Sequence, residues 1–341
     1  MPASNHSQSR RFGAGCWVLA FGLVSLSIEW APAADSIFVP GTKPVLLQET
    51  GAGEGPAWHP ELGLLTSGDG NTNRRDKEGK ASVYHTGTGS NGLMFDRDGR
   101  LILCESARYR VTRVEKDGKV TVLADRYEGH RFNTPNDLTQ DSKGQIYFSD
   151  PRYGDRDDME MVDDQGRKVE GVYRIDVDGK VTRIITHEVD RPNGVVITPD
   201  DKYLFVADNN NNAANGARKL WRFALKTDGS VDIASQKLIH DWKTTRGPDG
   251  MKLDMAGRLY VAAGLNRPNP PFESADKPTA GIYVFSPKGE LLEFVAIPRD
   301  ETTNCAFGGD DLKTLFVTAG GTLWSLRTTT PGVSVWKSNT K

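Results

Sequence analysis

Short runs of alternating apolar and polar residues, separated by turn residues, make up most of the chain after residue 35. The clearest run spans residues 246–263 (RGPDGMKLDMAGRLYVAA) and reads as a loop, a strand, a tight turn and a second strand. Related segments recur at residues 53–67, 90–104, 135–149, 192–207 and 303–318. The alternation therefore predicts a chain of antiparallel strand pairs rather than helices.

The turns inside these segments have a recurring composition. In the copies that begin at Asn91, Asn136 and Asp249, an Asp follows by five positions and a Gly by eight. Gly tolerates positive φ, and an Asp side chain caps a turn, so the pair predicts a hairpin. The copies at Asn193 and Asn304 need one more residue in the turn.

One polar residue precedes the first strand of every copy. These slot residues are Glu54, Asn91, Asn136, Asn193, Asp249 and Asn304. They lie 37, 45, 57, 56 and 55 positions apart, and repeats of roughly 40–50 residues with four strands each are typical of β-propeller blades. We therefore predict an all-β fold, a six-bladed β-propeller that forms one domain over residues 35–341. Equivalent positions should then converge on its axis.

The segments between the copies supply the remaining strands and the loops. Residues 36–50 contain a short apolar run, which we expect to add an outer strand to the last blade and so close the ring. Residues 67–80 are polar and Gly-rich and should form a loop. The Pro-rich residues 264–278 follow the Asp249 strand pair, so they are a candidate border for a substrate mouth.

Residues 1–34 differ from the rest of the chain. Arg10 and Arg11 precede an apolar stretch over residues 13–28, and Ala31–Ala34 resembles a cleavage site. This pattern is typical of a secretory signal peptide. We expect the protein to be secreted, in a bacterium to the periplasm, and the pattern leaves Sec and twin-arginine export both open. No later stretch approaches the length of a membrane-spanning helix.

The composition argues mainly against certain partners and sites. A net charge of −2 gives no reason to expect a nucleic-acid partner. Cys104 and Cys305 belong to different repeats, so we expect two buried free thiols. The six His residues lack ligand spacing, which makes a His- or Cys-based zinc site improbable.

Four slot residues carry chemistry if they converge. Glu54, Asn136, Asn193 and Asp249 offer oxygen ligands and two negative charges, a set that suits Ca²⁺, Mg²⁺ or Mn²⁺. A cation there would polarise a carbonyl group, and Asp249 is our candidate general base for an attacking water. These parts fit ester or lactone hydrolysis, since no GxSxG motif is present. The alternative is that Asn and Asp residues before strands merely cap turns, which is our expectation for Asn91 and Asn304.

A series of motifs, in a fixed order, resembles the senescence marker protein/gluconolactonase/luciferin-regenerating family, also called the regucalcin-like family. The motifs are GEGPAW at 53–58, SNGL at 90–93, RVEKDG at 113–118, LADRYEG at 123–129, PNDL at 135–138, IYFSDPRYG at 146–154, RPNG at 191–194, GPDGM at 247–251 and AFGG at 306–309. The set is most similar to the bacterial sugar-lactonase branch.

The resemblance implies specific roles. It makes Glu54, Asn193 and Asp249 metal ligands, Asn136 a contact of the metal or the substrate, and Asp249 also the proton donor and acceptor. The metal implied is divalent, calcium foremost, with magnesium, manganese or zinc as alternatives. Thr134 stands where animal members have a sugar-binding Arg, so it is a candidate substrate contact that departs from the family pattern.

The expected protein is a gluconolactonase-like carboxylic ester hydrolase that opens a small sugar lactone. We expect it to act as a monomer, without a nucleic-acid or membrane partner once the signal segment is removed. Two alternatives stay open. One is a related esterase or phosphotriesterase on the same metal site. The other is a non-catalytic propeller that binds a sugar or a partner and uses calcium structurally.

Overall fold

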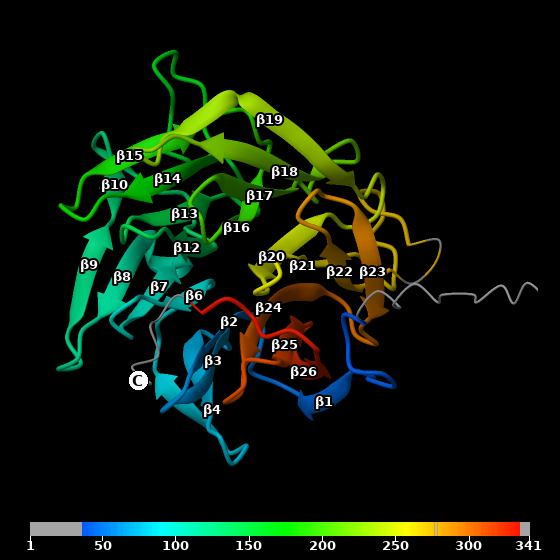
Figure 1. Cartoon of the computed structure of the whole chain (residues 1–341). Helices are drawn as coiled ribbons and strands as arrows, with labels where there is room; N and C mark the ends of the chain where they lie inside the picture. Colours follow the sequence, from blue (N-terminus) through cyan, green and yellow to red (C-terminus); the bar gives the residue numbers. More distant parts are fainter. Residues whose placement is uncertain (1–35, 276, 278, 335–341) are drawn as a thin grey trace, which may run out of the picture. The chain divides into compact units, whose positions relative to one another are not determined.

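A computed structural model describes residues 36–275, 277 and 279–334. The predicted signal segment, residues 1–34, lies outside the described residues, so both that segment and the export it implies stay predictions. The described residues form a six-bladed β-propeller (Figure 1), as the repeat predicted. Each blade is a four-stranded antiparallel sheet.

The strands of each blade follow one another from the axis outwards. Blade 1 contains β2 (Glu54–His59), β3 (Gly63–Gly68), β4 (Asn71–Arg75) and β5 (Ala81–His85). Blade 2 contains β6 (Leu93–Phe95), β7 (Leu101–Glu105), β8 (Arg110–Val114) and β9 (Val120–Ala124). Blade 3 contains β12 (Leu138–Gln140), β13 (Ile146–Asp150), β14 (Gly171–Ile175) and β15 (Val181–Ile185).

The second half of the ring repeats this order. Blade 4 contains β16 (Pro192–Ile197), β17 (Tyr203–Asn209), β18 (Arg218–Leu225) and β19 (Val231–Asp241). Blade 5 contains β20 (Pro248–Leu253), β21 (Leu259–Ala263), β22 (Gly281–Phe285) and β23 (Leu291–Ala296). Blade 6 contains β24 (Thr302–Gly308), β25 (Thr314–Ala319), β26 (Thr322–Arg327) and β1 (Val45–Gln48). A short helix η1 (Ser106–Arg108) and a hairpin of β10 (Arg126–Tyr127) and β11 (His130–Arg131) lie outside these four-stranded sheets.

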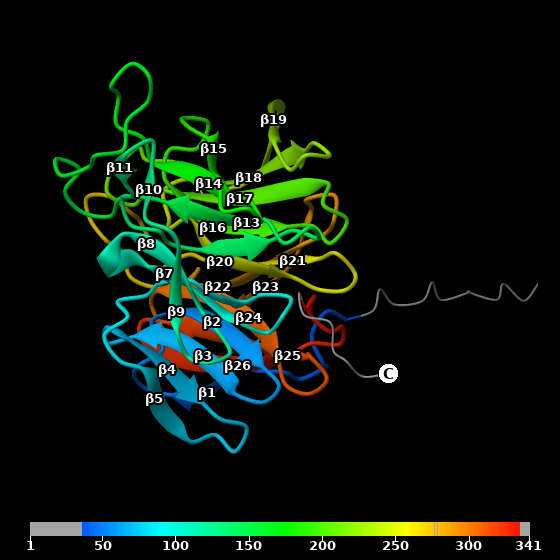
Figure 2. The ribbon, with the colours of Figure 1, turned by 90° about the vertical axis from the view of Figure 1, so that its left-hand side faces the viewer.

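The inner strands form a closed ring. β2 contacts β6 and β24, β12 contacts β6 and β16, and β20 contacts β16 and β24. Figure 2 shows four of these strands from the side, with β16, β20, β24 and β2 following one another from top to bottom. Because every inner strand has an inner strand on each side, its N-terminal residue lies near those of its neighbours.

The ring is closed by pairing the beginning of the described chain with its end. β1 pairs antiparallel with β26, and Phe38 bridges to Thr328. This confirms the prediction that residues 36–50 add an outer strand to the last blade. In this closure β1 covers the outer edge of β26, which would otherwise be exposed.

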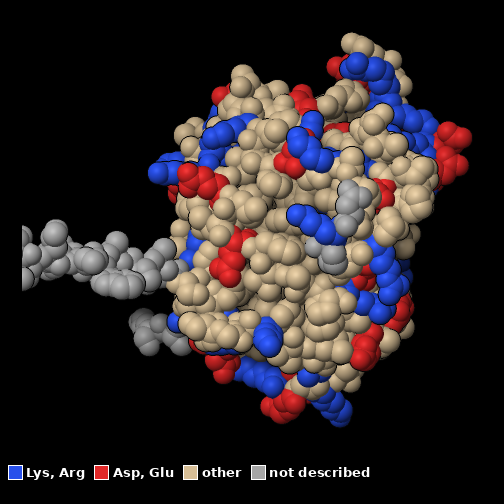
Figure 3. All heavy atoms as spheres, turned by 90° about the vertical axis from the view of Figure 1, so that its right-hand side faces the viewer, with Lys and Arg blue, Asp and Glu red and all other residues tan. Residues whose placement is uncertain are grey.

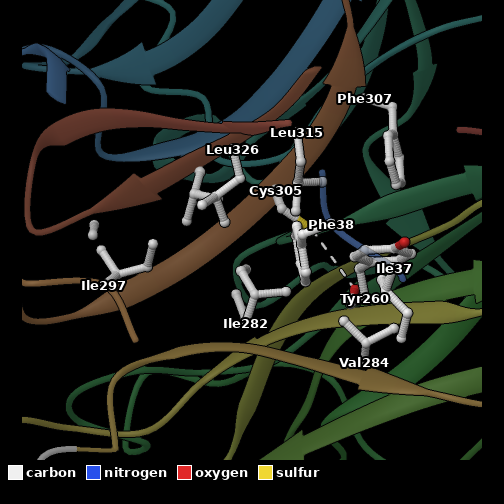
Figure 4. Packing of buried hydrophobic residues seen from close by; sticks show 13 residues of the cluster. Ile37, Phe38, Tyr260, Ile282, Val284, Ile297, Cys305, Phe307, Leu315 and Leu326 are labelled. Atoms are coloured by element: carbon white, nitrogen blue, oxygen red, sulfur yellow. Dashed lines mark hydrogen bonds between the residues drawn. The ribbon is translucent and has the colours of Figure 1, made fainter. Parts of the chain in front are cut away.

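Apolar side chains fill the spaces between adjacent blades. In the cluster between blades 5 and 6, Tyr260 and Ile282 come from blade 5, and Cys305 and Leu315 come from blade 6 (Figure 4). Phe38, from the segment before β1, packs against Tyr260 with an edge-on ring contact. Successive side chains of β21 point to opposite faces of the sheet, so Tyr260 and Ala262 join this cluster whereas Leu259, Val261 and Ala263 join the cluster on the other face.

The predicted turns form as the Asp and Gly residues indicate. The side chain of Asp254 accepts hydrogen bonds from the Ala256 and Arg258 amides at 2.9 Å, from Arg258 Nε at 2.7 Å and from Tyr260 Oη at 3.1 Å. Gly257 has φ of 75° in the same turn. Asp96 and Asp141 each accept two backbone amides in their own turns. The carboxylate therefore fixes the hairpin between the inner strand and the next strand.

One expectation about the loops is wrong. Residues 67–80 were expected to form a loop, but Gly68 ends β3 and residues 71–75 form β4. The side chains of β4 are polar, and hydrogen bonds replace apolar packing: Asn73 Nδ2 donates to the carbonyl oxygens of Gly51 at 2.8 Å and Gly68 at 3.0 Å. A strand held in this way has no hydrophobic signature in the sequence.

Three further observations concern the cysteine thiols, the surface charge and the membrane. Cys104 and Cys305 are both buried and free, as predicted. Lys, Arg, Asp and Glu side chains are interspersed on the face shown in Figure 3, and no single sign of charge dominates that face. Within the part of the chain that is described, no helix has the length and apolar character needed to cross a bilayer.

The turn carboxylates should contribute measurably to stability. We predict that Asp254→Ala lowers the free energy of unfolding by about 2–4 kcal/mol, because four hydrogen bonds to a fully buried carboxylate are lost together, one of them from the buried Tyr260 hydroxyl. Urea unfolding followed by tryptophan fluorescence would measure the loss. Asp117→Ala is the matched control, since that turn Asp is exposed and should leave the unfolding midpoint unchanged. Equal losses in both variants would contradict the role assigned to Asp254.

Candidate functional site

All the slot residues lie at the N-terminal ends of the inner strands. Glu54, Asn193, Asp249 and Asn304 fall within the first three residues of β2, β16, β20 and β24, whereas Asn91 and Asn136 lie two residues before β6 and β12. Asn304 Nδ2 donates to Glu54 Oε2 at 3.2 Å, so the last slot residue contacts the first. The structure therefore brings the slot residues to one end of the channel.

Glycine residues permit this close approach. A Cβ atom at Gly194 would collide with the carbonyl oxygen of Asp249, and one at Gly250 would collide with the side chain of Asn304. In blades 4 and 5, the glycine that follows the slot residue thus packs against the slot residue of the next blade. Only a residue without a side chain lets these two pairs of inner strands approach so closely.

The acids of the site are buried together. Desolvation raises the pKa of Glu54 to about 7, and nearby Asp137 adds to the rise, while hydrogen bonds from the Gly55 amide and Asn304 partly offset it. Desolvation also raises the pKa of Asp249 well above its usual range, with the Glu54 charge as the next cause and Arg246 as a partial offset. Buried acids that repel one another would gain from a bound cation.

Asp137 is a site residue that the sequence interpretation missed. Its side chain is 1% exposed, its Oδ1 accepts the Leu138 amide at 2.8 Å and its Oδ2 accepts Asn304 Nδ2 at 3.4 Å. The repeat contains the signal that would have found it. The residue after the slot is Gly in the copies at Glu54, Asn91, Asn193 and Asp249, but Asp in the copy at Asn136.

Asn193 has one of its two polar atoms engaged. Its Nδ2 donates to Tyr153 Oη at 2.7 Å, and its Oδ1 is buried with no hydrogen-bond partner among the described residues. A buried amide oxygen without a donor costs free energy unless another group approaches it. Together with the nearby acids, this free oxygen fits a hard cation.

Asn136 and Thr134 are the two remaining candidate residues, and both lie just before β12. Asn136 is 7% exposed, and its backbone amide donates to the Ser149 carbonyl at 2.9 Å. Thr134 is half-buried, and its hydroxyl donates to the Pro151 carbonyl at 2.5 Å. That bond occupies the Thr134 proton, so this hydroxyl has only acceptor capacity left for a ligand. The substrate contacts of both residues stay predictions.

A cluster of charged side chains adjoins Asp249, and all of its members except Glu301 are buried. Arg246, which is 5% exposed, pairs through Nη1 with Glu301 Oε2 at 2.5 Å and lies 3.5 Å, through Nε, from Glu273 Oε1. Arg218 Nε lies 3.9 Å from the same Glu273 oxygen. Glu273 belongs to the 264–278 loop, which therefore anchors a charge cluster next to the candidate site.

The donors that could hold a metal are of mixed type. Among the described residues, His, Cys, Asp and Glu side chains do not form any group of three that could hold an ion without other ligands. Two carboxylates, Glu54 and Asp249, combined with the Asn193 amide oxygen do fit a divalent cation, because Ca²⁺ and Mg²⁺ accept amide and carbonyl oxygens alongside carboxylates. The slot set is therefore a candidate metal centre.

A separate cavity lies at the opposite end of the inner strands. Its volume is about 580 Å³ and it is lined mainly by apolar residues, including Trp58, Phe95, Ile197, Leu253 and Phe307. These residues lie at or near the C-terminal ends of the inner strands, whereas the slot residues lie at the N-terminal ends. None of the slot residues lines this cavity, so it is distinct from the candidate metal centre.

Comparison with known proteins places the chain in a family. The model for the SMP-30/Gluconolactonase/LRE-like region matches residues 52–321. The chain therefore belongs to the SMP-30/gluconolactonase/LRE-like family, as the motif order indicated.

Individual relatives are similar to this chain at identities of 27–30%. A gluconolactonase from Zymomonas mobilis is 30% identical over 251 residues, which cover 72% of this chain and 64% of that protein. The match thus spans less than two thirds of that relative. A pentonolactonase from Haloferax volcanii is 29% identical over 283 residues, 79% of this chain and 81% of that protein. Among solved structures, a gluconolactonase from Xanthomonas campestris superposes with a TM-score of 0.69 at 27% identity, covering 86% of this chain and 91% of that one.

The crowding of acids predicts opposite effects of one substitution with and without metal. We expect Glu54→Gln to raise the melting temperature of the chelator-treated protein by about 2–4 °C, because one of the mutually repelling acids becomes neutral, an effect on the order of 1 kcal/mol. The same change should remove most of the stabilisation that added Ca²⁺ gives the unaltered protein. Differential scanning calorimetry in EDTA and in Ca²⁺ measures both effects.

Glu290→Gln is the control for that experiment. Glu290 is exposed, so its substitution should change neither melting temperature. A Glu54→Gln protein that melts lower in EDTA, yet keeps the full Ca²⁺ shift, would show that Glu54 neither repels the other acids nor binds the ion.

Proposed function

We propose that this protein is a metal-dependent lactonase that hydrolyses a sugar lactone to its hydroxy acid. The observation that carries the proposal is that Glu54, Asn193 and Asp249 all lie at the N-terminal ends of inner strands. The Glu54 charge raises the pKa of Asp249, and Asn193 Oδ1 is buried without a hydrogen-bond partner among the described residues. The lactonase names of the relatives from Zymomonas and Haloferax support the same class of substrate. The proposed class is a gluconolactonase-like carboxylic ester hydrolase.

Glu54, Asn193 and Asp249 are the residues proposed to hold the metal. Asn136 precedes Asp137, whose charge raises the pKa of Glu54, and Asn136 is the candidate for contact with metal or substrate. Carboxylate and amide oxygens favour Ca²⁺, with Mg²⁺, Mn²⁺ or Zn²⁺ as alternatives. A divalent cation bound there would supply Lewis acidity toward the lactone carbonyl.

Asp249 is the proposed proton carrier. In the metal-free protein, burial raises the pKa of Asp249 above that of an exposed Asp, and a bound cation would favour the charged form that accepts a proton. As a water oxygen forms a bond with the lactone carbonyl carbon, Asp249 takes one of the water protons. When the bond between that carbon and the ring oxygen breaks, Asp249 returns the proton to the ring oxygen, which becomes the hydroxyl of the product acid.

Charged side chains near Asp249 would support this proton transfer. Arg246 lowers the energy of the charged Asp249 carboxylate, while Glu54 and Glu301 raise it. The ion pair between Arg246 and Glu301 holds the guanidinium group beside the site. Opposing charges of this kind around a carboxylate are typical of sites that transfer protons.

Loss of the metal or of Asp249 should remove turnover. We predict that EDTA abolishes hydrolysis of glucono-lactone, and that added Ca²⁺ restores it. Asp249→Asn, measured with saturating Ca²⁺, should lower kcat by about 10²–10⁴-fold, since it removes the proposed base. The measurement is acid release followed with a pH indicator, corrected for spontaneous lactone opening. Asp117→Asn is the control and should retain full activity, and full activity in both EDTA and Asp249→Asn would refute the mechanism.

A panel of substrates distinguishes lactonase activity from its alternatives. We expect kcat/KM for glucono-, galactono- or xylono-lactone to exceed the values for an aryl ester and a phosphotriester by at least about tenfold, since this ratio ranks substrates directly. A higher value for the phosphotriester would instead favour an esterase or phosphotriesterase. If Ca²⁺ raises the melting temperature while no compound turns over, a binding propeller with a structural cation is the better explanation.

A further inference from the structure

Tyr153 joins the candidate metal centre to a loop outside the ring of inner strands. It comes soon after β13 in the sequence, and its Oη accepts a hydrogen bond from Asn193 Nδ2 at 2.7 Å. The Asn209 carbonyl oxygen lies 3.5 Å from the same hydroxyl and is an acceptor for its proton. A hydroxyl that donates to a carbonyl must accept from its other neighbour, so the nitrogen of Asn193, rather than the oxygen, faces Tyr153.

Buried charges fix the tyrosine ring. The Arg191 guanidinium carbon lies 5.0 Å from the centroid of the Tyr153 ring, a cation–π distance. Arg191 Nε pairs with Glu170 Oε2 at 2.9 Å, and the two side chains are 1% and 4% exposed. Glu170 Oε2 also accepts the backbone amide of Arg152 at 2.8 Å. The same carboxylate therefore holds both the arginine against the ring and the backbone next to Tyr153.

Orientation matters for Asn193 because the two ends of its amide differ chemically. Rotation by half a turn exchanges a donor nitrogen for an acceptor oxygen, and only the oxygen can bind a cation. In the structure the nitrogen donates to the Tyr153 hydroxyl, and the oxygen is buried without a hydrogen-bond partner in the described part of the chain. The hydroxyl of Tyr153 therefore distinguishes the two orientations of this amide.

We propose that Tyr153 is a positioning residue that sets the orientation of the Asn193 amide and so presents its oxygen to the cation. This inference rests on the proposed function, because it takes Asn193 as a metal ligand. Tyr153 acts through Asn193 and need not touch the metal. Partners of this kind, outside the ligand shell, typically change metal affinity by about 10–100-fold.

Tyr153→Phe tests the inference directly, because it removes the hydroxyl and keeps the ring against Arg191. The measurement is calorimetric titration of EDTA-stripped, re-purified protein with Ca²⁺. The expected result is a dissociation constant about tenfold higher than that of the unaltered protein, with little change in the melting temperature of the metal-free form. At saturating Ca²⁺, kcat should stay within a few-fold of the original, while half-maximal activation should shift to higher Ca²⁺ concentration.

A second substitution provides a rescue. Asn193→Asp replaces the amide by a carboxylate, whose two ends are both oxygen, so its orientation no longer matters. In this background Tyr153→Phe should change the Ca²⁺ affinity less than twofold. Tyr173→Phe is the matched control, since it removes a buried hydroxyl from the packing of blades 2 and 3, and it should leave the affinity unchanged.

The possible outcomes distinguish the role of Tyr153 from the proposed function. Equal Ca²⁺ affinities for the unaltered and Tyr153→Phe proteins would overturn the inference and leave the proposed function intact. A tenfold loss that persists in the Asn193→Asp background would also overturn it, because the effect would not pass through the amide. Absence of any Ca²⁺, Mg²⁺, Mn²⁺ or Zn²⁺ binding by the unaltered protein would overturn the proposed function together with the inference.

Discussion

The candidate site depends on how closely neighbouring inner strands approach one another at their N-terminal ends. At Gly194 and Gly250 there is no room for a Cβ atom, since the next blade presents the Asp249 carbonyl or the Asn304 side chain there. Because the strands approach so closely, the polar side chains at their N-terminal ends lie near one another around the axis. The pairing of β1 with β26 completes the last blade and joins the beginning of the described chain to its end.

Close approach has an electrostatic cost that identifies the site. Glu54, Asp137 and Asp249 are crowded together in a place where desolvation already disfavours their charges. Arg246 offsets part of this cost for Asp249, but its guanidinium is also shared with Glu301. A fold selected for stability alone would place apolar residues here, so the retained acids are better explained by a bound cation and the chemistry it allows.

The sequence predicted the features that arise from repetition and missed those that arise from contacts between distant residues. The spacing of the slot residues was sufficient to predict six blades. The apolar run before residue 50 was sufficient to predict the strand β1. β4 was missed because hydrogen bonds from polar side chains such as Asn73 hold it in place of apolar packing. The roles of Asp137 and Tyr153 depend on partners 167 and 40 positions away, Asn304 and Asn193. Nothing in the local sequence specifies such partners, although the replacement of Gly by Asp137 in the repeat was a visible clue.

The central claim is that one divalent cation binds where Glu54, Asn193 and Asp249 meet. The most direct test is an anomalous-difference map from crystals grown with Ca²⁺ and, separately, with Mn²⁺. We expect a single strong peak on the propeller axis, within about 2.1–2.6 Å of carboxylate oxygens of Glu54 and Asp249 and of Asn193 Oδ1. A peak elsewhere on the molecule, or an axis without any peak at millimolar metal, would contradict the claim.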